Sequence, residues 1–65
     1  MKINLHELRL RSNLTIRWLS RISHISAGTI SKIERGEINP SIAIICKLCC
    51  SLNVKIDEMV DCREE

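Results

Sequence analysis

Both glycines of the chain and its only proline fall within one run of sixteen residues, SAGTISKIERGEINPS, at positions 26–41. Glycine adopts left-handed backbone readily, and proline prevents a helix from continuing, so these residues mark the ends of regular structure. Gly36 stands where a C-terminal cap is wanted, and Pro40 directly precedes Ser41, a favoured N-cap residue. We therefore predict a helix over residues 27–35 that is fixed at both ends, and a second helix that starts after Ser41.

The rest of the chain also divides into short helical segments, with no strand pattern competing. Hydrophobic spacing and capping residues predict five helices in all, at residues 5–12 after Asn4, 16–23 after Thr15, 27–35 after Ser26, 42–52 after Ser41, and a short one from about Ile56. In the first helix, Leu5 and Leu8 are expected to face inward, and Arg9 and Arg11 outward. His24 fills the turn between the second and third helices.

Size and composition favour a single all-α domain. The chain has 65 residues, of which 45% are hydrophobic and only 2% aromatic, so its core has to be built from Ile and Leu. We expect one domain over residues 1–65, with a core at about 4–61 and a frayed end at 62–65. Apolar and charged residues alternate near the N-terminus, unlike a signal peptide or a membrane span, so we expect a cytoplasmic protein.

The positive charge is concentrated in the N-terminal half. Residues 1–36 carry seven Lys and Arg against two Glu, whereas residues 37–65 carry three basic residues against six acidic ones, and the whole chain has a net charge of +2. A basic half is typical of a protein with an anionic partner. On charge alone, a solvated surface with a lopsided charge distribution explains the pattern equally well.

The run from Leu14 to Val60 resembles the helix-turn-helix family of phage repressor and Cro proteins, also called the xenobiotic-response-element (XRE) family. The segment TISKIERGEINPS carries the strongest match, because it places the expected residue types at Ile30, Ile33, Glu34, Gly36, Pro40 and Ser41. The resemblance implies a compact five-helix, lambda-repressor-like domain. It also implies a sequence-specific transcriptional regulator, a dimeric repressor that binds double-stranded DNA with its 26–35 helix in the major groove.

The resemblance further implies which residues contact DNA. Residues near the N-terminus of a recognition helix reach base edges, and here these are Ala27, Gly28, Thr29, Ser31 and Lys32. Phosphate contacts are implied for Thr15, Arg17, Arg21, Ser26 and Arg35. Two positions depart from the family pattern, since Ile16 stands where many members carry glutamine and His24 where the turn usually has glycine.

The start of the implied recognition helix offers little direct readout. Ala27 and Gly28 carry no hydrogen-bonding side chain, so we expect weak or shape-assisted specificity. Gly28 lies inside the helix, where glycine costs about 1 kcal/mol relative to alanine. Either the helix backbone approaches DNA closely there, or the position simply tolerates glycine.

The helix at 42–52 is more apolar than one buried face requires. We expect a core stripe made of Ile42, Ile45, Cys46, Cys49 and Leu52. The apolar arc is widened to roughly 240° by Ile44, Leu48 and Cys50. Because the family often dimerises through its fourth and fifth helices, we predict a homodimer with an interface made of Ile44, Leu48, Cys50, Ile56 and Met59. Ordinary exposed apolar surface is the alternative.

The four cysteines raise a metal hypothesis, since Cys46 and Cys49 have the spacing of a zinc pair that Cys50 and Cys62 could complete. Three of them lie within one apolar helical pattern that accounts for two, so we expect small buried hydrophobes, with Cys50 and Cys62 as the more exposed thiols, and neither a metal nor a cofactor. No catalytic set stands at a convincing spacing, and an enzyme is not expected. Two other hypotheses are an antitoxin-like protein-interaction module that uses the apolar 41–52 helix, and a thiol or zinc sensor on the same DNA-binding fold.

Overall fold

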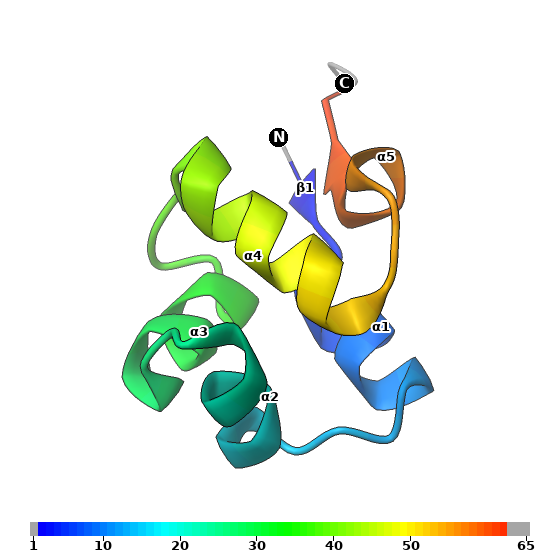
Figure 1. The fold of residues 1–65 in the computed structure, drawn as a ribbon. Helices are drawn as coiled ribbons and strands as arrows, with labels where there is room; N and C mark the ends of the chain where they lie inside the picture. Colours follow the sequence, from blue (N-terminus) through cyan, green and yellow to red (C-terminus); the bar gives the residue numbers. More distant parts are fainter. Residues whose placement is uncertain (1, 63–65) are drawn as a thin grey trace.

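The computed structural model describes residues 2–62 and contains five helices and one short antiparallel sheet (Figure 1). The helices are α1 Leu5–Arg11, α2 Ile16–Ser23, α3 Ala27–Glu34, α4 Ile42–Leu52 and α5 Ile56–Met59. The strands are β1 Lys2–Ile3 and β2 Val60–Asp61. The predicted five-helix architecture is confirmed, and each helix begins at the predicted residue.

Local capping chemistry fixes the starts of three helices as predicted. The side chains of Thr15, Ser26 and Ser41 accept hydrogen bonds from backbone N–H groups three residues later. Left-handed backbone follows the helices at Asn13, His24, Gly36 and Asn53. His24 therefore takes the turn conformation, with φ of 60°, even though it carries a side chain. Each cap satisfies backbone groups that would otherwise be unpaired at a helix end.

The small sheet was not predicted from the sequence. Lys2 pairs with Asp61 and Ile3 with Val60, and the backbone N–H of Asn4 donates to the carbonyl of Met59 at 2.8 Å. Strands of two residues are too short to show an alternating pattern, so hydrophobic periodicity contains no signal for them. The sheet brings the two ends of the described chain together beside α5 (Figure 1). Apart from Cys62, the predicted frayed end lies outside the described residues.

The core is aliphatic, as expected, and it draws on every helix. Its members are Leu5, Leu8, Leu19, Ile25, Ile30, Ile33, Ile45, Leu48, Cys49, Leu52 and Met59. Helix α4 crosses the middle of the fold and packs against α2 on one side and α5 on the other, while α3 packs against both α1 and α2 (Figure 1). Among the helices of residues 2–62, none combines the length and the hydrophobicity that crossing a membrane requires.

The face of α4 that enters the core differs from the predicted one. Ile45, Leu48, Cys49 and Leu52 are buried, whereas Ile42 is 65% exposed and Cys46 is also exposed. Assigning Ile42 and Cys46 to the core was therefore wrong. A helix that is apolar over most of its circumference has no unique inward face in its sequence, and packing against α2 and α5 selects one.

The face of α4 that is buried also leaves two residues of the predicted dimer interface inaccessible. Leu48 and Met59 have 0% exposed surface within a single chain, so neither side chain is accessible to a partner. Both belong to the hydrophobic core instead. Of the other three interface candidates, Ile44 is half-buried, and Cys50 and Ile56 are exposed.

Candidate nucleic-acid interface

The N-terminal turn of α3 presents small side chains to the surface. Ala27, Gly28 and Lys32 are exposed, and Thr29 and Ser31 are half-buried. The Ser26 hydroxyl accepts from the backbone N–H of Thr29 at 3.2 Å and donates to Thr29 Oγ1 at 2.8 Å. The Thr29 hydroxyl accepts in this contact, so its own proton is left to donate outward. The structure thus brings the five residues predicted to read bases onto one helix, with the Thr29 side chain held by the N-cap.

The C-terminal end of α3 carries a second polar cluster. Arg35 donates from Nη1 to the hydroxyl of Ser31 at 3.0 Å and from Nε to the carboxylate of Glu37. The side chains of Arg35 and Glu37 are 58% and 50% exposed, so this ion pair is open to solvent and weak. A phosphate that reaches Arg35 has to compete with Glu37. The same arginine also orients Ser31.

A basic hollow of about 370 Å³ opens beside the start of α2, and Thr15, Arg17, Trp18 and Arg21 line it. The Arg21 guanidinium carbon lies 5.8 Å from the ring centroid of Trp18, which is a cation–π distance. Thr15 Oγ1 accepts from the Trp18 backbone N–H at 3.1 Å. The structure thus groups three of the residues predicted to contact phosphate around one exposed indole.

Trp18 was left out of the predicted DNA contacts. Its side chain is 48% exposed, although tryptophan is usually well buried. The sequence feature that draws attention to Trp18 is its position between Arg17 and Arg21, which places the chain's only aromatic residue on a basic helix face.

An ion pair between α1 and the last turn of α3 fixes the orientation of the candidate recognition helix. Arg9 Nε donates to Glu34 Oε2 at 2.6 Å, and Nη2 donates to Oε1 at 3.1 Å. Nη1 donates to the carbonyl of Leu14 at 2.8 Å. The two side chains are only 9% and 7% exposed. The expectation that Arg9 faces outward was therefore wrong, because its partner lies 25 residues away and contributes nothing to the local periodicity.

His6 adds a third member to this pair, since its Nδ1 lies 2.9 Å from Glu34 Oε1. Burial alone raises the pKa of Glu34, but hydrogen bonds from Arg9 and His6 and their positive charge outweigh burial, so its pKa falls below the ordinary value. The hydrogen bond to Glu34 raises the pKa of Arg9 against the opposing effect of burial. Both groups are therefore held in their charged forms, which gives two parallel bonds between α1 and α3.

The open space around Gly28 excludes a packing reason for this glycine within the domain and is compatible with both interpretations of it. A Cβ atom built at Gly28 meets nothing within 4 Å, so no packing within the domain requires glycine there. Glycine at this position therefore either serves a contact with a molecule outside the chain or meets no structural requirement.

Residues 5–59, which run from the start of α1 to the end of α5, match the family model described as helix-turn-helix. The chain belongs to the XRE-type helix-turn-helix family. Its structure is similar to that of the restriction-modification controller protein C.AhdI from Aeromonas hydrophila, with a TM-score of 0.80 and 31% sequence identity over 83% of this chain and 82% of that one. No curated protein sequence matches the chain.

Family membership and this likeness make the chain a DNA-binding transcriptional regulator with the helix-turn-helix formed by α2 and α3. Within residues 2–62, no group of three or more His, Cys, Asp or Glu side chains is arranged to hold a metal ion.

Proposed function

We propose that this helix-turn-helix regulator is a cytoplasmic, non-enzymatic homodimer that represses transcription by placing α3 of each copy in the major groove of a palindromic operator. One observation carries the proposal. The small, exposed N-terminal turn of α3 lies on a helix that is capped at its start and held at its end by the buried pair of Arg9 and Glu34. A recognition helix has to be held rigidly, because base contacts depend on its position within the groove.

In this proposal, contacts to bases and to phosphates come from separate residues. Ala27 offers a methyl group to thymine, and Thr29, Ser31 and Lys32 offer hydrogen bonds. Gly28 lets the backbone approach the groove. The phosphates are contacted by Thr15, Arg17, Arg21, Ser26 and Arg35.

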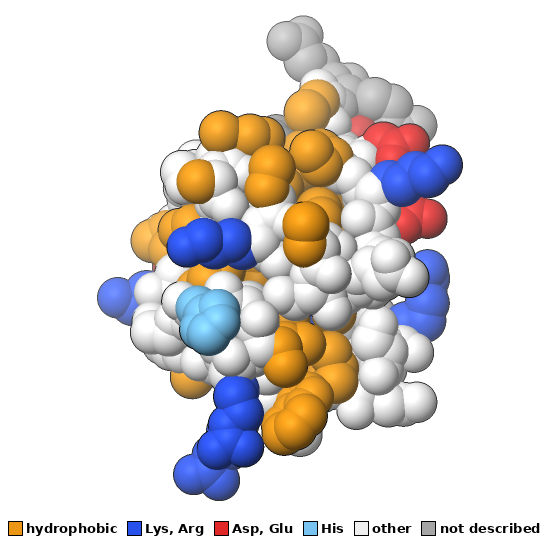
Figure 2. Space-filling view, viewed as in Figure 1, with side chains coloured by type: hydrophobic (Ala, Val, Ile, Leu, Met, Phe, Trp, Pro, Cys, Tyr) orange, Lys and Arg blue, Asp and Glu red, His pale blue; other side chains and the backbone are white. Residues whose placement is uncertain are grey.

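A second copy of the chain is the proposed occupant of an apolar surface that we call the α4 face. It comprises the exposed residues Ile22, Ile42, Cys46, Cys50 and Ile56. Half-buried Ile44 packs against the core and lines neither of the hollows beside this surface. Figure 2 shows hydrophobic side chains gathered along α4 and down toward α2, with the acidic side chains grouped near α5. Contiguous apolar surface of this kind is typical of an interface.

Shallow hollows of about 560 and 540 Å³ flank the exposed row of Cys46 and Cys50 on α4, which we call the α4 ridge, one toward α2 and one toward α5. Lys47 lines the first hollow, whereas Lys55 and Asp57 both line the second, so charge does not distinguish the two borders. The apolar ridge itself supports the partner. A two-fold axis parallel to α4 sets the ridges of two copies against each other, so a second copy covers the exposed apolar surface of both chains at once.

Selection of bound duplexes from a random-sequence DNA library, at near-physiological salt, tests the proposal. We expect an enriched inverted repeat with half-sites about one helical turn, ~34 Å, apart. Retention of DNA without enrichment would mean that the basic surface binds phosphates without reading bases. Absence of retention would contradict the proposal.

The apolar α4 face also supports an alternative, an antitoxin-like module that binds a different protein there. Light scattering without DNA separates the two functions. A dimer mass at micromolar concentration supports the homodimer, whereas a monomer mass favours an unlike partner.

Replacing Lys32 by alanine is expected to weaken operator binding and to change its salt dependence in a diagnostic way. If the ammonium contacts a phosphate, the slope of log K against log salt concentration falls by about one unit. If it contacts a base instead, the slope is retained and discrimination at one position of the operator falls. Fluorescence anisotropy of labelled duplex at several salt concentrations measures both. Arg11→Ala, which removes an exposed charge on α1 away from the proposed DNA contacts and from the α4 face, is the matched control and should leave the slope unchanged.

Replacing Gly28 by alanine is expected to change stability and binding in opposite directions. The folded domain gains about 1 kcal/mol, because alanine is the better helix former and the added methyl group meets no atom of the protein. Operator affinity falls if the helix backbone lies close to the groove. Thermal unfolding and anisotropy measure the two effects on one sample. Unchanged affinity in the stabilised variant would assign glycine at this position to tolerance alone.

A further inference from the structure

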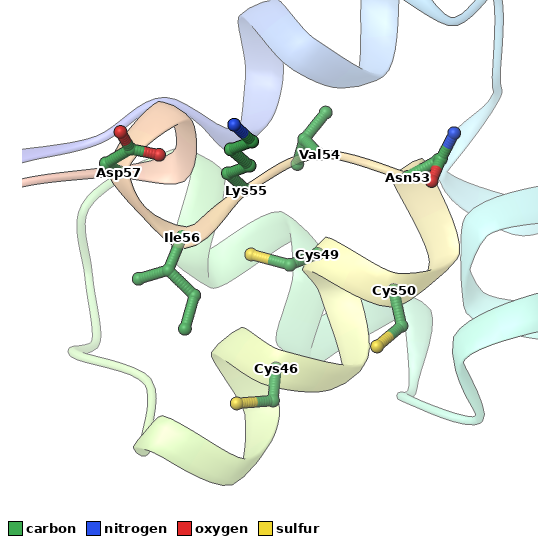
Figure 3. A pocket seen from close by; sticks show the side chains of 8 residues that line it. All are labelled: Cys46, Cys49, Cys50, Asn53, Val54, Lys55, Ile56 and Asp57. Carbon is green, nitrogen blue, oxygen red and sulfur yellow. The ribbon is translucent and has the colours of Figure 1, made fainter.

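Two exposed thiols occupy the ridge of the α4 face. Cys46 and Cys50 lie one helical turn apart on the same side of α4, and both line both of its flanking hollows. Figure 3 shows them on α4 beside Cys49 and opposite the side chain of Ile56. Cys49 is only 5% exposed and belongs to the core. The ridge of this surface is therefore made of two side chains that can be altered chemically without touching the core.

The remaining cysteines make the two ridge thiols distinguishable. Cys49 is shielded by the fold, and burial raises the pKa of its thiol, which lowers the fraction of reactive thiolate. Cys62 is exposed and follows β2, outside the residues that line either hollow. One chain thus carries a shielded thiol, a free thiol away from the α4 face, and a pair that only a partner would cover.

The ridge geometry leaves little space for anything between two copies. Ile42, Cys46 and Cys50 stand at successive turns, so they form one straight row along α4. Packed helices lie about 8–10 Å apart, and the distance depends on the side chains at the contact. Cysteine is small enough for close approach. A tripeptide with charged carboxylates attached to either sulfur fills that space and takes charge into an apolar contact.

We propose that Cys46 and Cys50 are a modification site for low-molecular-weight disulfides such as oxidised glutathione, and that a mixed disulfide there separates the two copies and releases DNA. The inference rests on the homodimer proposed above. In the free monomer that is in equilibrium with the dimer, the Cys46 or Cys50 thiolate attacks one sulfur of oxidised glutathione, and the glutathione S–S bond breaks as the protein–glutathione S–S bond forms. One glutathione leaves as its thiolate and takes up a proton. A free thiol reverses the exchange and restores the protein thiol.

Separation of the copies is expected to weaken operator binding strongly. Two linked recognition helices bind an inverted repeat with the second contact made at high effective concentration, and this gain is typically 100-fold or more. A monomer loses this gain in affinity, although every residue of its own DNA-contacting surface is retained. Modification therefore lowers affinity by about 100-fold without altering the half-site that is preferred.

The test compares the reduced protein with the protein treated with oxidised glutathione. Mass spectrometry locates the adducts, light scattering gives the mass, and anisotropy gives the affinity for the duplex that the library selects. We expect adducts at Cys46 or Cys50, a change from dimer to monomer, and recovery of the dimer with dithiothreitol. Cys46→Ser/Cys50→Ser should remain a dimer under oxidised glutathione. Cys62→Ser, the matched control, should respond like the unchanged protein.

The outcomes separate this inference from the function on which it rests. A monomer mass for the reduced protein would overturn the homodimer, whatever glutathione does. A dimer that survives with glutathione on Cys46 or Cys50, or a reaction confined to Cys62, would overturn the modification site and leave the homodimer intact. Labelling with N-ethylmaleimide needs no variant. If Cys46 and Cys50 react as fast as Cys62 at concentrations where the protein is a dimer, the thiols lie outside the interface and the inference fails.

Discussion

Replacing Arg9 by methionine is expected to lower the free energy of unfolding by about 3 kcal/mol or more. The change leaves the carboxylate of Glu34, whose side chain is 7% exposed, without its two hydrogen bonds from the guanidinium. Only His6 then remains beside it. Removal of one member of a buried ion pair costs more than the pair contributes, because the remaining charge stays desolvated. Urea unfolding followed by circular dichroism at pH 7 measures the loss.

The expected loss of unfolding free energy is large compared with the total stability of the domain, so it can be measured. A chain of 65 residues has a total stability of roughly 3–10 kcal/mol, so a loss of this size leaves a measurable unfolded fraction. Arg11→Met is the matched control, since Arg11 lies on the same helix and is exposed. It should change stability by about 0.5 kcal/mol at most. A loss below about 1 kcal/mol for Arg9→Met would contradict a buried ion pair at this site.

The same pair predicts how stability depends on pH. The pKa of Glu34 is lower in the folded protein than in the unfolded chain, so folding favours the carboxylate. Its contribution is complete above the unfolded pKa, near 4.5, and is lost as the pH falls through the lower, folded value. Glu34→Gln removes this titration, so its unfolding free energy should fall less steeply than that of the unchanged protein in acid. Equal slopes would show that other carboxylates determine the acid response.

The parts of the fold that depend on neighbouring residues could be predicted from the sequence. Thr15, Ser26 and Ser41 cap helices, and Gly36 ends one, through hydrogen bonds and backbone preferences that involve only a few adjacent positions. The residues of the run 26–41 therefore predict both ends of the candidate recognition helix without reference to the rest of the chain. The implied DNA contacts on α3 lie together on one surface for the same reason.

The parts that depend on distant residues could not be predicted. Arg9 follows the local pattern of a surface residue, and only Glu34, 25 positions later, explains its burial. The pairing of β1 with β2 joins the two ends of the described chain across two residues on each side. In each case the stabilising contact is formed in space between segments whose own sequences contain no sign of it.

Tertiary packing also selects which face of α4 points inward. After the ion pair, we expect substitutions on this face to have the largest effect on stability. Replacing Leu48 by alanine should lower the free energy of unfolding by about 2–5 kcal/mol, because the side chain is fully buried and its removal leaves a cavity. Replacing Ile42 by alanine removes a side chain that is 65% exposed, and should change the stability of the monomer by about 0.5 kcal/mol or less. Urea unfolding at low protein concentration measures both.

The two α4 variants should also separate folding from assembly. Ile42 lies on the α4 face, so its replacement should weaken the dimer in light scattering at a stability close to that of the unchanged protein. Leu48 supports the core beneath that face, so its replacement should reduce dimer and fold together. If Ile42→Ala destabilised the monomer as much as Leu48→Ala, the helix would be rotated toward the face that its sequence pattern indicated. Ile42 and Cys46 would then belong to the core, and the surface proposed to hold a second copy would be lost with them.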